Sequence, residues 1–244
     1  PANKGIEIQA VLEKLRIILE ESDVSFTMVS EQDAQAKFGE QSDGNEMSQW
    51  MADLDQSSDL VLLCCTDLAS DWFRHGLQFA ERFVVIADGD SEIDYDPRLL
   101  DKLGDDLHQH YVKELLLLGR GRRYDDSNAS AWLQGVEYYR HHHVALENRS
   151  SVERFCRFLT GKANALVLAG GGTRGWAHVG AMRAFYECGL EFDLVGGTSA
   201  GSVVAALYAA GEEYNNLCHV MDMLLRASLE AVKVSSYTLP VVSI

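Results

Sequence analysis

The sequence predicts an α/β protein whose strands run parallel and are covered by helices. In the first half, short apolar runs with the length of buried strands alternate with segments of helical periodicity, the pattern of a parallel sheet with crossover helices. In the second half, two strand-turn-helix units follow one another between Asn164 and Gly211. The composition fits such a protein, since 47% hydrophobic and 24% charged residues among 244 allow one or two packed domains.

The elements of the first half can be placed in chain order. Residues 6–21 predict an amphipathic helix, because Val11, Leu15 and Ile18 recur near helical spacing with charges between them. The elements expected after it are a strand at 24–29, a helix at 42–56, a strand at 59–65, a helix at 68–81, a strand at 83–87, a short helix at 99–107, a strand at 111–118, a strand through 141–143 and a linker helix at 151–159. Because the chain opens on a helix, we also expect a strand ahead of it.

The first unit of the second half contains a glycine loop. Residues 165–169 form a continuous apolar run that predicts a buried strand. The run leads into Gly170-Gly171-Gly172-Thr173-Arg174-Gly175 and then into a helix. A glycine loop that opens a helix turns its N–H groups outward, and the helix dipole adds partial positive charge. We therefore expect the loop to bind an anion, either a phosphate or a reaction oxyanion.

The second unit carries a G-x-S-x-G motif. A short strand at 192–196 is followed by Gly197-Thr198-Ser199-Ala200-Gly201 and a small, apolar helix at 202–210. A serine on such a turn takes a strained backbone conformation with its hydroxyl exposed. The flanking Gly197 and Gly201 remove the Cβ atoms that would collide with the strand and the helix. Ser199 is the candidate nucleophile.

These residues carry a family resemblance. The runs GGGTRGWAHVGAMRAF and FDLVGGTSAGSVVAALYAAG resemble the patatin-like phospholipases. Within them the match is to the neuropathy-target-esterase branch, whose members act on lysophospholipids and phospholipids, and it extends more weakly through much of the upstream chain. The resemblance implies ester hydrolysis by a Ser-Asp dyad, without a metal or organic cofactor. The residues it implicates are Ser199 as nucleophile, Gly170, Gly171 and Gly172 as the oxyanion hole, and Arg174, Gly175, Gly197 and Gly201 as the supporting loop and elbow.

The same resemblance implies a domain organisation. Residues 1–160 correspond to a Rossmann-like domain with a structural or regulatory role, and residues 161–244 to the start of the patatin-like catalytic domain. In that branch cyclic-nucleotide-binding domains come first, so we expect them upstream in the full-length protein. The family aspartate lies in a downstream Asp-Gly-Gly or Asp-Gly-Ala motif, whereas Asp222, in a Met-Asp-Met setting, reads as an ordinary helix position. We expect the catalytic domain to be truncated here and the chain alone to be inactive.

Three alternatives were weighed against the esterase. A nucleotide- or phosphate-binding regulatory module would use the glycine loop, which lacks the lysine of a P-loop. A catalytically inactive interaction scaffold would explain the missing aspartate. A Ser-His-Asp triad would need His178 or His219, but His178 precedes the serine and no suitable acid lies between Ser199 and His219.

Charge and cysteine content bear on partners and location. The formal net charge of −16 excludes broad nucleic-acid binding and electrostatic adsorption onto anionic membranes. Contact with a lipid substrate or a membrane surface would therefore be mostly apolar and peripheral. The sequence has no uninterrupted apolar stretch of about 20 residues. Its five cysteines, Cys64 and Cys65 among them, lack metal-type spacing, and reduced thiols in the cytoplasm fit them best.

Two further clusters suggest ligands and also have simpler explanations. Gly119-Arg120-Gly121-Arg122-Arg123 could grip a phosphate or head group, but Asp125 and Asp126 follow directly, so a solvated loop is favoured. His141-His142-His143 invites a metal hypothesis. On a strand only His141 and His143 would share a side, so a structural strand is favoured over a zinc site.

Overall fold

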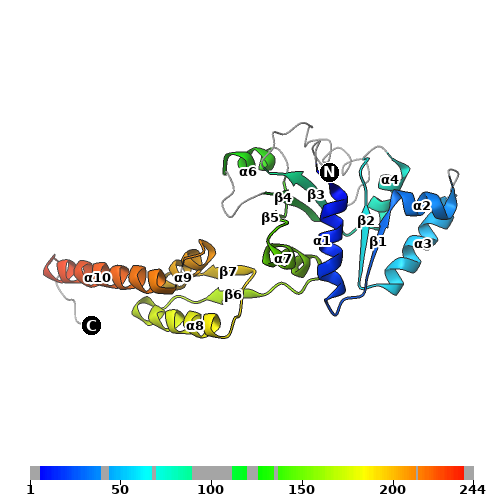
Figure 1. Ribbon diagram of the computed structural model, residues 1–244. Helices are drawn as coiled ribbons and strands as arrows, with labels where there is room; N and C mark the ends of the chain where they lie inside the picture. Colours follow the sequence, from blue (N-terminus) through cyan, green and yellow to red (C-terminus); the bar gives the residue numbers. More distant parts are fainter. Residues whose placement is uncertain are drawn as a thin grey trace, which may run out of the picture. The chain divides into compact units, whose positions relative to one another are not determined.

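The computed structural model describes residues 6–39, 44–67, 70–89, 112–119, 126–134, 137–212 and 214–238 (Figure 1). Its contacts divide the chain into two compact units, Pro1–Lys162 and Ala163–Ile244. The helix expected at 99–107 and the basic cluster at 120–123 lie outside the described residues.

The first unit is built from parallel strands and helices. Its helices are α1 (Ile8–Glu20), α2 (Glu31–Phe38), α3 (Gly44–Ser57), α4 (Asp71–Phe79), α6 (Asp126–Leu133) and α7 (Arg149–Leu159). Its strands are β1 (Phe26–Ser30), β2 (Leu60–Cys64), β3 (Arg82–Asp88), β4 (Val112–Leu118) and β5 (Arg140–Val144). Strands β1 and β2 pair in parallel, and a second parallel sheet has the order β3-β4-β5. The prediction of an α/β protein with parallel strands is confirmed, although these strands form two hydrogen-bonded groups.

One hydrophobic core joins the two groups of strands. Helix α1 buries Val11, Leu15 and Leu19 in it, and α7 adds Val152 and Phe155. Every strand of the unit contributes side chains to this core: Phe26, Met28, Leu60, Leu62, Val84, Ile86, Leu116, Leu118 and Val144. Helices α1 and α7 lie side by side over it (Figure 1).

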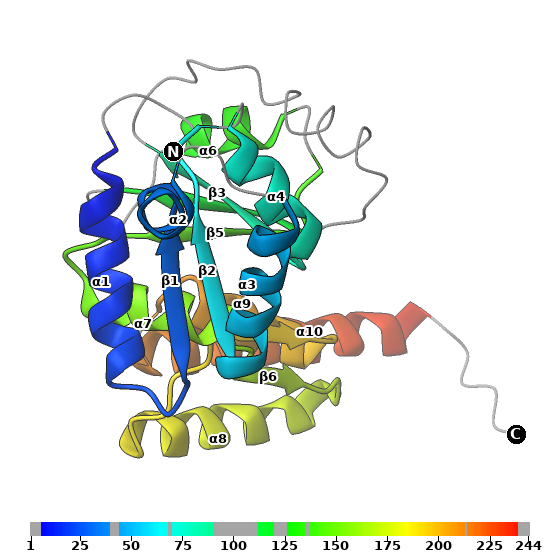
Figure 2. The same ribbon diagram turned by 90° about the vertical axis from the view of Figure 1, so that its right-hand side faces the viewer.

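The opposite strand faces are covered as well. Beyond β3-β4-β5, Val85, Leu115 and Leu117 pack around Trp132 of α6. Beyond β1-β2, a separate core contains Val29 together with Met47, Met51 and Trp72 from α3 and α4. Figure 2 shows β1 and β2 between α1 and α3. The first unit thus has helices on both faces of its strands, which is why its strands read as continuous apolar runs.

The second unit contains both expected strand-turn-helix elements. Its order is β6 (Ala165–Leu168), the 3₁₀ turn η1 (Gly172–Gly175), α8 (Trp176–Glu187), β7 (Leu194–Gly197), α9 (Ala200–Ala209) and α10 (Tyr214–Thr238). Strands β6 and β7 are parallel neighbours that end together, with Leu168 opposite Gly197. Leu168, Met182 of α8, Val204 of α9 and Leu217 of α10 form one core. The predicted pairing of these two strands is confirmed.

Helix α2 was not predicted from the sequence. It has eight residues and buries one of them, Ala34, so it shows little amphipathic periodicity. A capping box stabilises its start: the Ser30 hydroxyl accepts from the Asp33 N–H, and the Asp33 carboxylate accepts from the Ser30 N–H. Local hydrogen bonds rather than burial account for this helix. Helix α6 was not predicted either.

The cysteines are reduced, and the described helices are not of the membrane-spanning kind. All five cysteines are free thiols. Burial raises the pKa of Cys65 and of Cys156 to about 12, so both stay protonated at neutral pH. Of the helices in the described ranges, none is both long enough and apolar enough to cross a bilayer.

A buried carboxylate is hydrogen-bonded inside the first unit. Glu114 of β4 is 1% exposed, and its Oε2 lies 3.1 Å from Nε2 of His142 on β5. Arg82 Nε lies 3.8 Å from the other carboxylate oxygen, and Arg82 Nη1 donates to the carbonyl oxygen of Phe158 at 2.8 Å. The His142 ring contacts Phe155 and Phe158 of α7. The network therefore ties β3, β4 and β5 to the end of α7.

The Glu114 carboxylate is stabilised in its charged form. Burial by itself raises the pKa of Glu114, but the hydrogen bond from His142 and the charge of Arg82 outweigh it and hold that pKa below its usual value. Folding therefore gains stability from ionised Glu114 above the ordinary glutamate pKa. That contribution is lost as pH falls through the lowered value.

We predict that Glu114→Ala lowers the free energy of unfolding by about 3 kcal/mol at pH 7, because it leaves Arg82 and His142 without their partner. Glu114→Gln keeps the shape and should cost less. Urea denaturation at pH 7, 5 and 3 checks both variants. The gap between wild type and Glu114→Gln should shrink toward pH 3, and a gap that is constant with pH would rule out the charged pair as its source.

Candidate active site

Ser199 occupies a strained turn between β7 and α9. Its φ of 52° and ψ of −122° make it the one non-glycine residue with positive φ among those described. Such a conformation costs on the order of 1–3 kcal/mol and persists only where the surroundings enforce it. The side chain is exposed. The prediction that the G-x-S-x-G serine sits strained and exposed at a strand-to-helix turn agrees with this geometry.

Close backbone approach explains the two glycines of the motif. A Cβ on Gly201 would overlap the carbonyl oxygen of Leu168 and lie 2.6 Å from that of Ala169. A Cβ on Gly197 would overlap the backbone of Gly201 and lie 2.6 Å from the nitrogen of Ser202. Helix α9 can therefore start directly against the ends of β6 and β7 only with glycine at both positions.

The glycine loop begins against Ser199. A Cβ on Gly170 would lie 3.3 Å from Cβ of Ser199 and 3.3 Å from the Thr198 carbonyl oxygen. The loop is closed by a 3.0 Å hydrogen bond from the Arg174 N–H to the Gly171 oxygen, and Gly172 has a φ of +55°. Within the described ranges, the N–H groups of Gly170, Gly171 and Gly172 have no acceptor. These exposed amides are available to an anion beside the serine.

Gly175 brings the start of α8 to the start of α9. A Cβ at Gly175 would lie 2.5 Å from Cβ of Ala200, a distance no real side chain tolerates. The positive ends of two helices therefore meet beside Ser199. Arg174 is exposed on the same loop.

The neighbouring serine differs from Ser199. The Ser202 hydroxyl donates to the Ser199 carbonyl oxygen at 2.6 Å, a bond within the first turn of α9. The Ser202 hydroxyl proton is thus already donated to a backbone carbonyl oxygen.

The other polar candidates lie in defined places. Asp222 forms an ion pair with Arg226 one turn further along α10, at 2.7 Å, in keeping with an ordinary helix position. His219 is exposed on the same helix. His178 Nε2 lies 2.7 Å from the carbonyl oxygen of Ala169. Because a carbonyl oxygen only accepts, Nε2 carries the proton and cannot take one from Ser199.

Sequence reasoning missed Asp193. This residue is 4% exposed, and its Oδ2 accepts from the Asn164 N–H at 2.9 Å. The Asp193 and Leu194 N–H groups both donate to the Asn164 carbonyl oxygen. Asp193 thereby joins the starts of β6 and β7, and a lone acid at the start of an apolar strand was the signal for it.

The histidine cluster behaves as strand geometry predicts. The rings of His141 and His143 are in contact, with centroids 5.2 Å apart, while His142 faces the buried Glu114. Among the described residues, no group of three potential ligands is placed to hold a metal ion.

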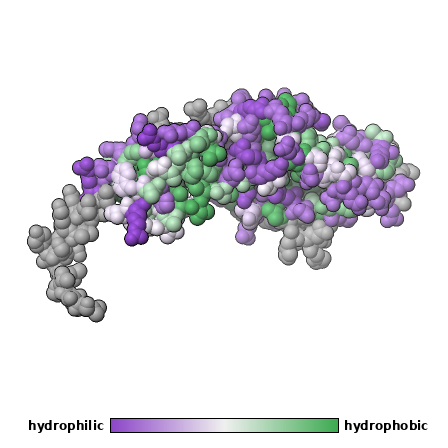
Figure 3. All heavy atoms as spheres, turned by 90° about the horizontal axis from the view of Figure 1, so that it is seen from below, coloured by the Kyte–Doolittle hydropathy of each residue, from purple (hydrophilic) through white to green (hydrophobic). Residues whose placement is uncertain are grey.

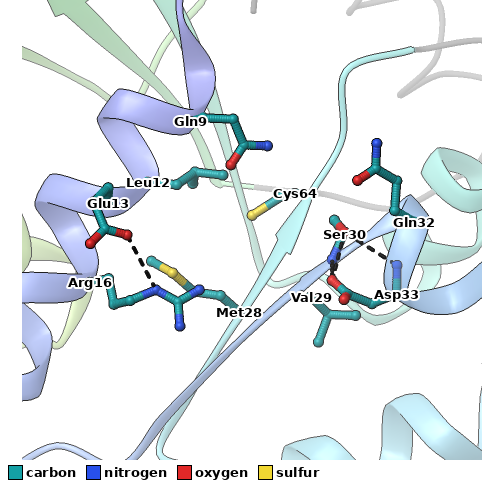
Figure 4. Close-up of a pocket in the computed structure, with 10 residues that line it drawn as sticks. All are labelled: Gln9, Leu12, Glu13, Arg16, Met28, Val29, Ser30, Gln32, Asp33 and Cys64. Carbon is teal, nitrogen blue, oxygen red and sulfur yellow. Dashed lines mark hydrogen bonds and ion pairs between the residues drawn. The ribbon is translucent and has the colours of Figure 1, made fainter. Parts of the chain in front are cut away.

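A small pocket lies in the first unit. It lies between α1 and the ends of β1 and β2 and has a volume of about 180 Å³, below the roughly 300 Å³ at which ligand pockets begin (Figure 4). Arg16 pairs with Glu13, and Ser30 pairs with Asp33. Burial raises the pKa of the Cys64 thiol to about 11, so it stays neutral. Arg16 and Asp33, two of the charged groups that line the pocket, thus have partners within it.

Strand, strained serine and helix, with a glycine loop alongside, have the geometry of the nucleophile elbow of serine hydrolases. The chain belongs to the neuropathy target esterase family of patatin-like phospholipases. The model of that family's P-loop-like domain matches residues 1–167, and the model of patatin-like phospholipases matches residues 166–237. The resemblance stated from the motifs is thereby confirmed.

Named relatives agree with the family models. A patatin-like phospholipase domain-containing protein, ZK370.4, from Caenorhabditis elegans is 30% identical over 204 residues, covering 66% of this chain and 15% of the relative. Human patatin-like phospholipase domain-containing protein 6 is 30% identical over 191 residues, 67% of this chain and 14% of its own. The neuropathy target esterase sws of Drosophila melanogaster is 28% identical over 193 residues, which cover 67% of this chain and 13% of the relative. The chain thus spans about one seventh of the relatives it matches, and no solved structure matches it.

We predict that Gly201→Ala lowers the free energy of unfolding by roughly 1–3 kcal/mol, because its methyl group would meet rigid backbone at Leu168. Gly180→Ala is the matched control, since a Cβ there meets nothing within 4 Å. In the middle of α8 that change should stabilise by about 0.5–1 kcal/mol. Urea denaturation followed by circular dichroism measures both, and shifts of the same sign would contradict the close approach.

Proposed function

We propose that this chain carries the nucleophile and the oxyanion loop of a serine esterase that hydrolyses carboxyl esters of lysophospholipids and phospholipids. The observation that carries the proposal is the strained, exposed Ser199 set directly against the glycine loop at Gly170. Membership of the neuropathy target esterase family supports a lipid substrate.

The proposed reaction has two steps. The Ser199 Oγ attacks the ester carbonyl carbon, and the carbonyl electrons move to the oxygen, where the amides of Gly170, Gly171 and Gly172 stabilise the charge. Collapse breaks the ester bond, releases the alcohol and leaves an acyl serine, and water then releases the fatty acid. An aspartate takes the serine proton as the base of a Ser-Asp dyad and returns it to the oxygen of the leaving alcohol; it then takes a proton from the attacking water and returns it to Ser199 Oγ. No metal or organic cofactor enters either step.

We also propose peripheral contact with a lipid surface. The second unit exposes several large apolar side chains: Val167, Tyr186, Leu190, Leu194, Met223 and Leu224. Figure 3 shows hydrophobic surface on the face of the second unit that is turned to the viewer. With a net charge of −16, attraction to anionic head groups does not favour adsorption. Apolar contact is the mode that these features support. The proposal places it at a membrane that faces the cytoplasm, the compartment that free thiols fit best.

We predict that Ser199→Ala, in the complete gene product containing this sequence, lowers kcat for lysophospholipid hydrolysis by at least about 10³-fold. The fold should be retained, because the change removes one exposed oxygen. Ser202→Ala is the control and should keep activity, since the Ser202 hydroxyl is bonded to the Ser199 carbonyl. A carbonyl-directed organophosphonate, followed by mass spectrometry of the labelled peptide, should mark Ser199. Labelling at Ser202, or full turnover in Ser199→Ala, would end the assignment.

We predict no appreciable esterase turnover by the 244-residue chain alone. Asp222 is paired with Arg226, and a serine without its base is a weak nucleophile. Hydrolysis of a short-chain p-nitrophenyl ester by the purified chain is the measurement, with Ser199→Ala as background. Serine-dependent turnover by the chain would show that the base lies within it.

A further inference from the structure

One side chain, that of His178, forms a hydrogen bond across the proposed oxyanion loop. His178, in the first turn of α8, donates from Nε2 to the carbonyl oxygen of Ala169 at 2.7 Å. Ala169 is the residue immediately before the glycine loop, and α8 begins immediately after it. The hydrogen bond therefore spans the loop and joins its two ends.

That bond orients a candidate oxyanion donor. The Ala169 carbonyl and the Gly170 N–H belong to the same planar peptide unit, in which they point in opposite directions. Holding the carbonyl oxygen therefore sets the direction of the Gly170 N–H. Gly170 is also the loop residue that abuts Ser199, since a Cβ on it would lie 3.3 Å from the serine Cβ.

The backbone hydrogen bonds of the described turn go to the residues on either side of this peptide. The Thr198 N–H bonds to the Leu168 oxygen, one residue earlier, and the Arg174 N–H bonds to Gly171, two residues later. Gly201 packs beside the Ala169 oxygen without donating to it, because its N–H bonds to the Thr198 oxygen. His178 is the side chain that bonds to the peptide between these two fixed points.

We propose that His178 is a positioning residue of the esterase, which aligns the Gly170 amide of the oxyanion hole through the Ala169 carbonyl. The inference rests on the proposed function of Ser199 and the loop. It gives His178 no role as a base. Neutral imidazole with its proton on Nε2 and protonated imidazolium both keep the donor, so the alignment does not depend on the charge of the ring.

Two substitutions of His178 distinguish a donor at the position of Nε2 from one at the position of Nδ1. In His178→Gln the side-chain amide nitrogen reaches about as far as Nε2, so the donor to Ala169 is preserved. In His178→Asn the amide reaches only the position of Nδ1, and the donor is lost. Both variants are polar and uncharged and carry the same amide group, so they differ in reach and in helix propensity, of which the second affects the folded fraction.

The test uses the complete gene product and compares kcat, KM and the rate of organophosphonate labelling of Ser199. His178→Asn should lower kcat and the labelling rate by about 10–100-fold with KM for lysophospholipid changed less than about threefold, because a misaligned oxyanion donor acts on the transition state. His178→Gln should stay within about threefold of wild type, with an unchanged pH profile. Labelling rates are divided by the folded fraction from circular dichroism, so a folding defect in the Asn variant cannot imitate the result.

Two results would overturn the proposal. If the Asn variant matches wild type while Ser199→Ala is inactive, the positioning role is wrong and the esterase proposal stands. If Gln and Asn are equally inactive and a limb of the pH profile disappears, His178 acts as an acid or base. Turnover that persists in Ser199→Ala would instead refute the proposed function itself.

Discussion

The candidate site depends on how closely α9 approaches the end of β6. At Gly201 the helix backbone comes within contact of the Leu168 and Ala169 carbonyl oxygens, at a distance that leaves no room for a methyl group. That approach forces the chain to reverse between β7 and α9 within a few residues, and Ser199 takes the positive φ that the reversal requires. The strain in the serine and the glycines around it have one cause. The exposed hydroxyl follows from the same geometry.

The neighbouring glycine loop is also packed closely. Gly170 fits against Ser199, and Gly175 fits against Ala200, so the starts of α8 and α9 lie close together. Gly170, whose N–H is one of three loop amides without an acceptor in the described ranges, then lies beside Ser199 together with the N-termini of α8 and α9. Such a site favours the charge of a tetrahedral oxyanion over a neutral ester, which is the preference that ester hydrolysis needs.

The first unit is organised around β4. This strand pairs with β3 on one side and β5 on the other, and Leu115, Leu116 and Leu117 are each at most 1% exposed. Alternate leucines enter different cores, one under α1 and α7 and one around Trp132. Glu114 at the start of the strand is satisfied by His142 and Arg82, and Arg82 also binds the Phe158 carbonyl at the end of α7. The last helix of this unit is therefore held by both packing and a buried charge network.

The sequence by itself determined what depends on near neighbours along the chain. Apolar runs and helical spacing placed most strands and helices, and the glycines around Ser199 predicted the strained turn, because strand, turn and helix are contiguous there. Alternation on a strand also predicted that His141 and His143 would lie together. The short helix α2 was not predicted, because a capping box defines it and it has no periodic apolar face.

Only the tertiary structure decided which distant residues meet. Glu114 and His142 are 28 residues apart and pair because β4 and β5 are adjacent. Asp193 reaches Asn164 because β6 and β7 start together, and the contact of Gly201 with Leu168 exists because they also end together. The sequence offered His178 only as a candidate triad member, and its hydrogen bond to Ala169 exists because the glycine loop brings the start of α8 back to the end of β6. Local patterns specify elements, whereas the register between strands and the path of a loop specify contacts, because these arise only when separate segments pack.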